Sequence, residues 1–171
     1  MIRFLLALVL ALALAACTAD VPQTPDPSEG PTATAACGTV ETFPVQGEGH
    51  LVGDQEPPVP YNSSPPTSGW HTSTDVAIGV AAENQPLSEP EQVTVLELGG
   101  VVVSHGRLAD EQRARLEELV RQERFDGKAA LTRYDELAPG EIVLSGWTVL
   151  QRCNDIDPAA IEAFISYYAQ R

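Results

Sequence analysis

A serine and a histidine in the stretch SSPPTSGWH, residues 63–71, are the first candidates for chemistry. Ser68 and His71 have the residue types of a nucleophile and its general base. No GxSxG turn surrounds the serine, and the sequence offers no obvious acid to orient the histidine. Glycine-rich loops of the kind that bind phosphate are absent from the sequence as well. We therefore predict that the protein is not an enzyme.

The same stretch also has a structural interpretation, which we prefer. The prolines at 65 and 66 favour extended backbone, and the hydroxyls at 67 and 68 can bond to neighbouring backbone groups. Gly69 permits a positive φ. A rigid turn would explain these residues, with His71 as its brace.

Glu97 is unusual because it lies between Leu96 and Leu98 in the valine-rich stretch VTVLELGGVVVSH, residues 93–105. A carboxylate in an apolar strand needs a partner, such as a backbone donor, an arginine or a histidine. His50 and His105, taken alone, are predicted to be surface residues or half-buried residues with satisfied nitrogens.

The elements that must position these residues follow from the hydrophobic pattern. Four segments have patterns typical of strands: 39–45, 93–105, 129–134 and 141–153. Residues 47–53 are predicted to form a turn that leads into another short extended piece. The glycine pair within 93–105 predicts a bulge or a tight hairpin. Residues 54–75 have no helical period and are predicted to form a loop.

Two segments have helical spacing. They are residues 108–125 and the end of the chain, where Asp157 is the expected N-cap and Pro158 lies in the first turn. The residues predicted to face inward are Leu116, Leu119, Val120, Ile161, Phe164, Ile165 and Tyr168. Strands interleaved with helices predict a single α+β domain, with two amphipathic helices packed on a mostly antiparallel sheet.

The charge balance excludes one class of partner. The chain has 24 acidic residues against 10 lysines and arginines, for a formal net charge of -14. Nucleic-acid binding relies on basic side chains that neutralise phosphates, so we expect no nucleic-acid partner. Electrostatic docking on anionic lipid is disfavoured for the same reason.

The first residues, MIRFLLALVLALALAAC, predict export. Arg3 precedes an apolar run over residues 4–16, which is shorter than the roughly 20 residues of a membrane span. The segment LAAC, residues 14–17, resembles the lipobox of bacterial lipoproteins. That resemblance implies a signal peptide over 1–16, fatty acylation of Cys17, for example by palmitate, and anchoring on the extracytoplasmic face of the cell membrane. The alternatives are a short membrane anchor or an ordinary signal peptide with an incidental Cys17.

Residues 17–36 are rich in Pro, Thr and Ala and contain little that can be buried. Such a composition predicts a disordered tether between the lipid and a folded domain over residues 37–171. With Cys17 committed to lipid, Cys37 and Cys153 can pair in an oxidising compartment. The alternative is a pair of buried free thiols.

The segments PPTSGWH, VLELGGVVV and SGWTVLQRC, together with the final helix, resemble the domain-of-unknown-function 3105 family of bacterial exported and membrane-anchored proteins. The resemblance covers nearly all of residues 37–171. The positions that match the family pattern are His50, Tyr61, residues 65–69, His71, Glu97, Gly99, Trp147 and Cys153.

This chain departs from the family pattern at two places. Thr94 and Leu98 replace both histidines of an HxLEHG segment, and Trp70 replaces a proline before His71. The resemblance leaves His50, His71 and Glu97 as the remainder of a possible copper or zinc ligand set. If the family site holds metal, this copy should hold it weakly or not at all.

The leading functional hypothesis is a noncatalytic lipoprotein domain, without a cofactor, that binds a protein or small-molecule partner outside the membrane. Its pocket would lie at His50, His71 and Glu97, and the other candidates for pocket residues are Tyr61, Ser68 and Trp70. The alternative is a metal-handling protein in which His50, His71 and Glu97 bind copper or zinc. A third possibility, weak hydrolysis, would require a reactive Ser68.

Overall fold

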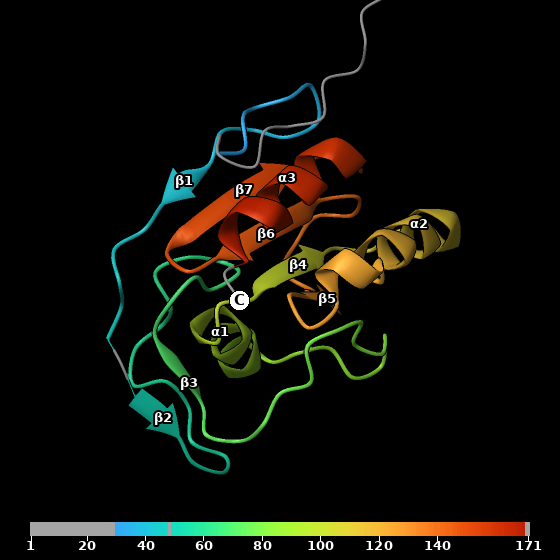
Figure 1. The fold of residues 1–171 in the computed structure, drawn as a ribbon. Helices are drawn as coiled ribbons and strands as arrows, with labels where there is room; N and C mark the ends of the chain where they lie inside the picture. Colours follow the sequence, from blue (N-terminus) through green and yellow to red (C-terminus); the bar gives the residue numbers. More distant parts are fainter. Residues whose placement is uncertain (1–29, 48, 170–171) are drawn as a thin grey trace, which may run out of the picture.

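The centre of the protein is a five-stranded sheet with strand order β1-β7-β6-β4-β5. The computed structural model describes residues 30–47 and 49–169 (Figure 1). The strands are β1 (Glu41–Thr42), β4 (Val101–His105), β5 (Ala129–Arg133), β6 (Ile142–Gly146) and β7 (Val149–Cys153). Strands β4 and β5 are parallel, whereas the other neighbouring pairs are antiparallel. The predicted α+β class with a mostly antiparallel sheet is confirmed.

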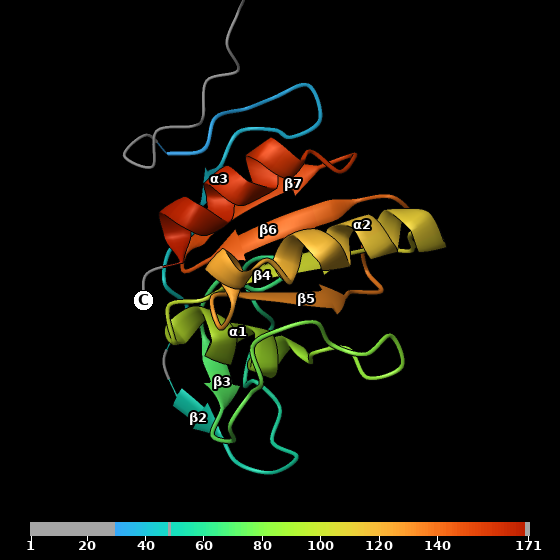
Figure 2. The same cartoon turned by 45° about the vertical axis from the view of Figure 1, so that its right-hand side comes forward.

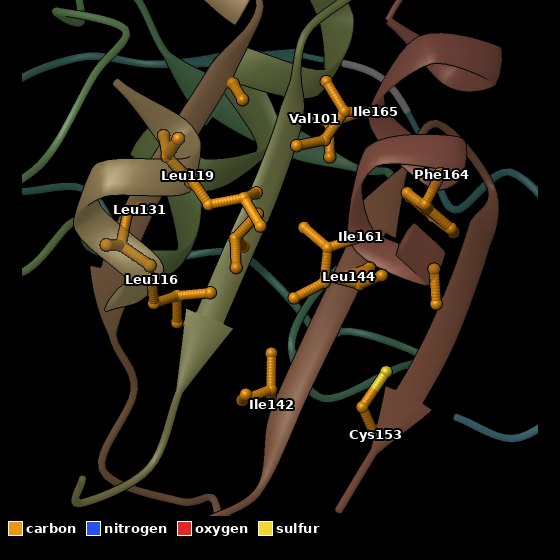
Figure 3. Close-up of a cluster of buried hydrophobic side chains, with 14 of the residues drawn as sticks. Val101, Leu116, Leu119, Leu131, Ile142, Leu144, Cys153, Ile161, Phe164 and Ile165 are labelled. Atoms are coloured by element: carbon orange, nitrogen blue, oxygen red, sulfur yellow. The ribbon is translucent and has the colours of Figure 1, made fainter. Parts of the chain in front are cut away.

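Helices cover both faces of this sheet. Helices α2 (Asp110–Val120) and α3 (Pro158–Tyr168) lie on one face, and α1 (Glu89–Glu97) lies on the other (Figure 2). A single-turn helix, η1 (Glu123–Phe125), follows α2. Side chains alternate along each strand, so Val101 and Val103 join the core under α2 and α3, whereas Val102 joins the core under α1. Figure 3 shows the first of these cores.

The two amphipathic helices form as predicted. Leu116, Leu119 and Val120 of α2 are buried, as are Ile161, Phe164 and Ile165 of α3, while Tyr168 packs partly buried against the same core. The Asp157 carboxylate accepts a hydrogen bond from the backbone N–H of Ala160. It therefore caps α3 at the predicted position.

Helix α1 overturns one prediction. The valines of residues 93–97 predict a strand, yet these residues are helical, and only residues 101–105 form β4. Residues 92–96 are buried on all sides, so the helix lacks the alternating polar face that would reveal its period. The glycine pair ends this helix: Gly99 has φ +78°, and the N–H of Gly100 bonds to the carbonyl of Val95 at 2.9 Å.

The segment 141–153 also differs from its prediction. It forms two strands, β6 and β7, joined at Trp147 and Thr148, rather than one alternating strand. Thr148 has φ +62°, which allows the tight reversal. All five residues of β6 are buried, because helices cover both faces of the sheet. The strand therefore shows no alternation of polar and apolar residues that would mark where it ends.

A second, two-stranded sheet lies beyond α1 and contains β2 (Gly49–Leu51) and β3 (Trp70–Thr72), which pair in parallel (Figure 1). The prediction of a loop over 54–75 is therefore wrong at residues 70–72. The first strand is also shorter than predicted, since only residues 41–42 of the segment 39–45 pair in the sheet. These strands have two or three residues, too few to show a period.

A disulfide joins the two ends of the domain. Cys37 and Cys153 are bonded, with Cα atoms 4.0 Å apart, and both are buried. Backbone bonds from Gly38 to Arg152 and from Asn154 to Ala36 hold the segments together at this point. The predicted pairing is confirmed.

Within residues 30–47 and 49–169, the structure has no helix with the length and hydrophobicity needed to cross a bilayer. The signal peptide, Cys17 and most of the predicted tether lie outside the described residues.

Candidate functional site

The candidate site is built on the parallel pair of β2 and β3. Their register places His50 beside His71, so the two side chains project on the same side of the ribbon. The imidazole rings meet edge to face, with centroids 4.4 Å apart. His71 is 4% exposed, whereas His50 is an exposed residue. The pair thus contains one buried and one surface imidazole.

The loop before β3 fixes the position of His71. Residues 65–69 are all buried. The Thr67 carbonyl accepts a hydrogen bond of 2.9 Å from the N–H of Thr148, in the turn between β6 and β7. The Ser68 hydroxyl accepts one of 3.0 Å from the N–H of Gln46. The loop is therefore joined to the main sheet on one side and to the segment before β2 on the other.

Tyr61 and Trp70 brace the same loop. The Tyr61 hydroxyl donates to the Trp70 carbonyl at 2.6 Å, and its ring lies against Gly69, where φ is +122°. Burial is the main cause that raises the pKa of the Tyr61 hydroxyl above its ordinary range. Trp70 and His71 are consecutive in β3, so their side chains point to opposite faces, and the indole lies against Gly47.

Helix α1 brings Glu97 to His71. The Thr94 hydroxyl accepts a hydrogen bond of 3.1 Å from the N–H of Thr72 and thereby ties α1 to β3. Glu97 ends the helix, with a side chain that is 46% exposed and an Oε2 atom 2.9 Å from Nε2 of His71. The structure therefore brings His50, His71 and Glu97 together.

The bonding of His71 determines what the site can accept. Nδ1 lies 3.2 Å from the Gly69 carbonyl oxygen, which can only accept, so we assign a proton to Nδ1. Nε2 faces the Glu97 carboxylate but forms no hydrogen bond with it or with any other described residue. In the neutral ring, Nε2 presents a lone pair to a carboxylate oxygen. These two acceptors at 2.9 Å require positive charge, either a second ring proton or a cationic group from a ligand.

The sequence analysis anticipated the partner of Glu97 but not its setting. A histidine does lie beside the carboxylate, yet Glu97 lies at a half-exposed helix end instead of within an apolar strand. The role of Thr94 was missed, because a threonine among valines gives no sign that it will bond to a distant strand. Leu98, at the C-cap of α1, is 54% exposed.

No group of three or more His, Cys, Asp or Glu side chains that could hold a metal ion is found in the part of the chain that the structure describes.

The fold and the site define an α+β domain joined end to end by a disulfide, with a histidine–carboxylate cluster outside its main sheet. A family model described as a protein of unknown function, DUF3105, matches residues 53–171, and the chain belongs to that family. The matched residues include His71 and Glu97, whereas His50 lies before them. Comparison with curated proteins and with solved structures gave no match.

Proposed function

We propose that this chain is a noncatalytic, lipid-anchored domain on the extracytoplasmic face of the cell membrane, and that its His50–His71–Glu97 cluster binds a positively charged group of a partner. The observation that carries the proposal is the contact between Nε2 of His71 and Oε2 of Glu97, at 2.9 Å. A buried nitrogen without a hydrogen bond, beside a half-exposed carboxylate, favours a cationic or donor group at that point.

Two features support the location. The lipobox-like segment that ends at Cys17 supports lipid anchoring. The Cys37–Cys153 disulfide supports export, because such bonds persist mainly in oxidising compartments.

One feature supports a noncatalytic role. Ser68 is fully buried, and its hydroxyl is engaged by the Gln46 N–H. A nucleophile needs access to its substrate, so this burial favours a structural role for the serine.

Photo-crosslinking in the native cells tests the proposal. A photoreactive residue replaces exposed Leu98, next to Glu97, and exposed Val59 serves as the control position. We expect a discrete adduct from position 98 that is lost on Glu97→Gln, which removes the negative charge with little change of shape. Identical adducts from both positions, or an adduct unaffected by Glu97→Gln, would contradict the proposal.

The second candidate function is the handling of copper or zinc. The observation that favours it is the approach of two imidazole rings, with centroids 4.4 Å apart, beside a carboxylate. Titration of the full-length protein with copper and with zinc separates the two candidates. Binding at micromolar concentration or tighter that is lost in His71→Ala supports metal handling, and the absence of uptake rejects it.

A further inference from the structure

A polar cavity of about 420 Å³ lies at the carboxyl ends of β4 and β5. These two strands are parallel and are connected through α2, so they form a strand–helix–strand unit. Figure 2 shows that α2, which follows β4 and precedes β5 in the chain, lies over the face of the sheet. In such units, ligands commonly bind outside the carboxyl ends of the strands, near the start of the following helix. The cavity therefore has the position expected of a ligand site.

Three nitrogen-bearing side chains converge there on one carboxylate. Glu83 lies 3.7 Å from Nε2 of His105, 3.8 Å from Nε of Arg113 and 3.9 Å from Nη1 of Arg133. The three residues come from the ends of β4 and β5 and from α2, and His105 and Arg133 are register partners. All three distances exceed those of charge-assisted hydrogen bonds. Glu83 thus offsets part of the charge of the two arginines without a direct hydrogen bond to either.

The nitrogens of this group are only partly engaged. His105 is 3% exposed and lines the cavity, and its Nδ1 lies 2.7 Å from the Gly106 carbonyl, which leaves Nε2 for the cavity side. The Nε atom of Arg133 is buried and has no hydrogen-bond partner among the described residues. A buried guanidinium N–H without an acceptor is costly, so an additional acceptor here would stabilise it.

The start of α2 adds backbone N–H donors to the same cavity. Its N-cap is Ala109, whose side chain has no acceptor for the first helical N–H groups. Arg107 also lines the cavity, so three of the ten lysines and arginines of this acidic protein gather at one place. The cavity is also lined by three carboxylates, those of Glu83, Asp110 and Asp135. Asp135 accepts a hydrogen bond of 2.9 Å from Arg133, and Glu117 accepts one of 2.7 Å from Arg113.

We propose that this cavity binds a small carboxylate-bearing molecule. In the free protein, the side-chain carboxylate of Glu83 occupies the position that the ligand carboxylate takes in the complex. Glu83 lies on the loop between β3 and α1, and its side chain is 42% exposed, so it can move aside. A free carboxylate can approach Arg113 and Arg133 more closely than the tethered one does. The volume suits a molecule of a few carbon atoms with one to three carboxylates.

Calorimetric titration of the full-length protein with succinate and with citrate tests the proposal. We expect saturable binding that weakens about tenfold or more in Arg113→Gln and in Arg133→Gln, because each loses charge-assisted hydrogen bonds. Arg115→Gln is the matched control, since Arg115 is an exposed residue of the same helix. It should change the affinity less than twofold.

Glu83→Gln gives a test that misfolding cannot imitate. Removal of the competing carboxylate should tighten succinate binding severalfold. Four results would each overturn the proposal: no saturable binding of either carboxylate, equal losses in Arg113→Gln and Arg115→Gln, weaker binding in Glu83→Gln, or phosphate binding tighter than that of both carboxylates.

Discussion

His71 and His105 lie in different regions of the molecule but have the same local design. Each is almost fully buried, each has Nδ1 beside a glycine carbonyl, and each has Nε2 turned towards a glutamate. At His71, on the small β2–β3 sheet, the Glu97 carboxylate lies at 2.9 Å. At His105, on the main sheet, the Glu83 carboxylate lies at 3.7 Å and also faces Arg113 and Arg133.

The difference shows that a histidine–glutamate pair does not by itself define the charge of a ligand. Carboxylate and lone pair together make the His71 region attractive to a positive group. In the His105 region, two guanidinium groups supply charged hydrogen-bond donors, which suit a carboxylate. The neighbours of the pair decide the outcome, and they come from different elements in the two regions.

The glycines beside the two histidines should show the largest effects. A Cβ on Gly106 would collide with the backbone carbonyl of Ala138, so we expect Gly106→Ala to lower the free energy of unfolding by about 3 kcal/mol or more. A Cβ on Gly69 would lie 3.0 Å from the carbonyl of Gln46 at a φ of +122°, and Gly69→Ala should cost about 2 kcal/mol. Urea unfolding measures both. Equal stability of either variant and the parent would show that the glycine is not required.

Leu98→His should strengthen the preference of the His71 region for positive charge. The new imidazole would follow Glu97, which contacts His71, at an exposed helix end. Outer-shell partners alone change metal affinity roughly 10-fold to 100-fold, so a further ligand should raise zinc affinity by about 100-fold. Calorimetry measures this change, with Val59→His as the exposed control. A similar gain in both variants would mean that the cluster contributes nothing.

Thr94→Val should weaken the His71 region alone. The substitution keeps the shape but leaves the N–H of Thr72 without its acceptor, which costs about 1 to 2 kcal/mol. Glu97 should then lose its fixed position relative to His71, while the His105 region is unaffected. Urea unfolding gives the first effect, and unchanged succinate binding gives the second. Thr39→Val, at an exposed position, is the control.

Tyr134 connects the two regions and should have the smallest effect. It follows Arg133, and its hydroxyl donates to Glu89 at the start of α1 at 2.6 Å. Burial, and then the bond to Glu89, raise the pKa of Tyr134 above its ordinary value of 10.0. The folded state therefore keeps a proton that the unfolded state releases, and the stability from this group is lost as pH rises above about 10.

The alkaline loss can be measured by unfolding at several pH values. Tyr134→Phe should make the decline above pH 10 shallower, because one of the groups responsible is removed. A decline of the same slope in the variant would assign the loss to other groups.

Elements with one polar face could be predicted from the sequence. The helix around Leu116 and the capped helix at Asp157 show a clear period because each has a solvent side. The prediction is wrong at Val93 and Val95, since a helix buried on all sides looks like a buried strand. The sequence does contain the signal that ends this helix, the glycine at 99, but a glycine pair among valines predicts a bulge or a tight hairpin equally well.

The candidate sites were predictable to different degrees. His71 and Glu97 could be selected from a motif and from a carboxylate among leucines, although their contact depends on the α1 geometry that was missed. The second group could not be predicted, because Glu83, His105, Arg113 and Arg133 share no local spacing. The β4–α2–β5 connection brings the histidine and the two arginines together, and the loop between β3 and α1 adds Glu83.

Nitrogen-detected NMR of the histidine side chains is the most direct test of the central claim, that the two regions accept ligands of opposite charge. One sample of the full-length protein is titrated with ethylammonium chloride, a small organic cation, and a second sample with sodium succinate. We predict that ethylammonium shifts the ring signals of His71 and leaves those of His105 in place, and that succinate does the reverse. Ethylammonium shifts at His105 alone, or succinate shifts at His71 alone, would contradict this claim.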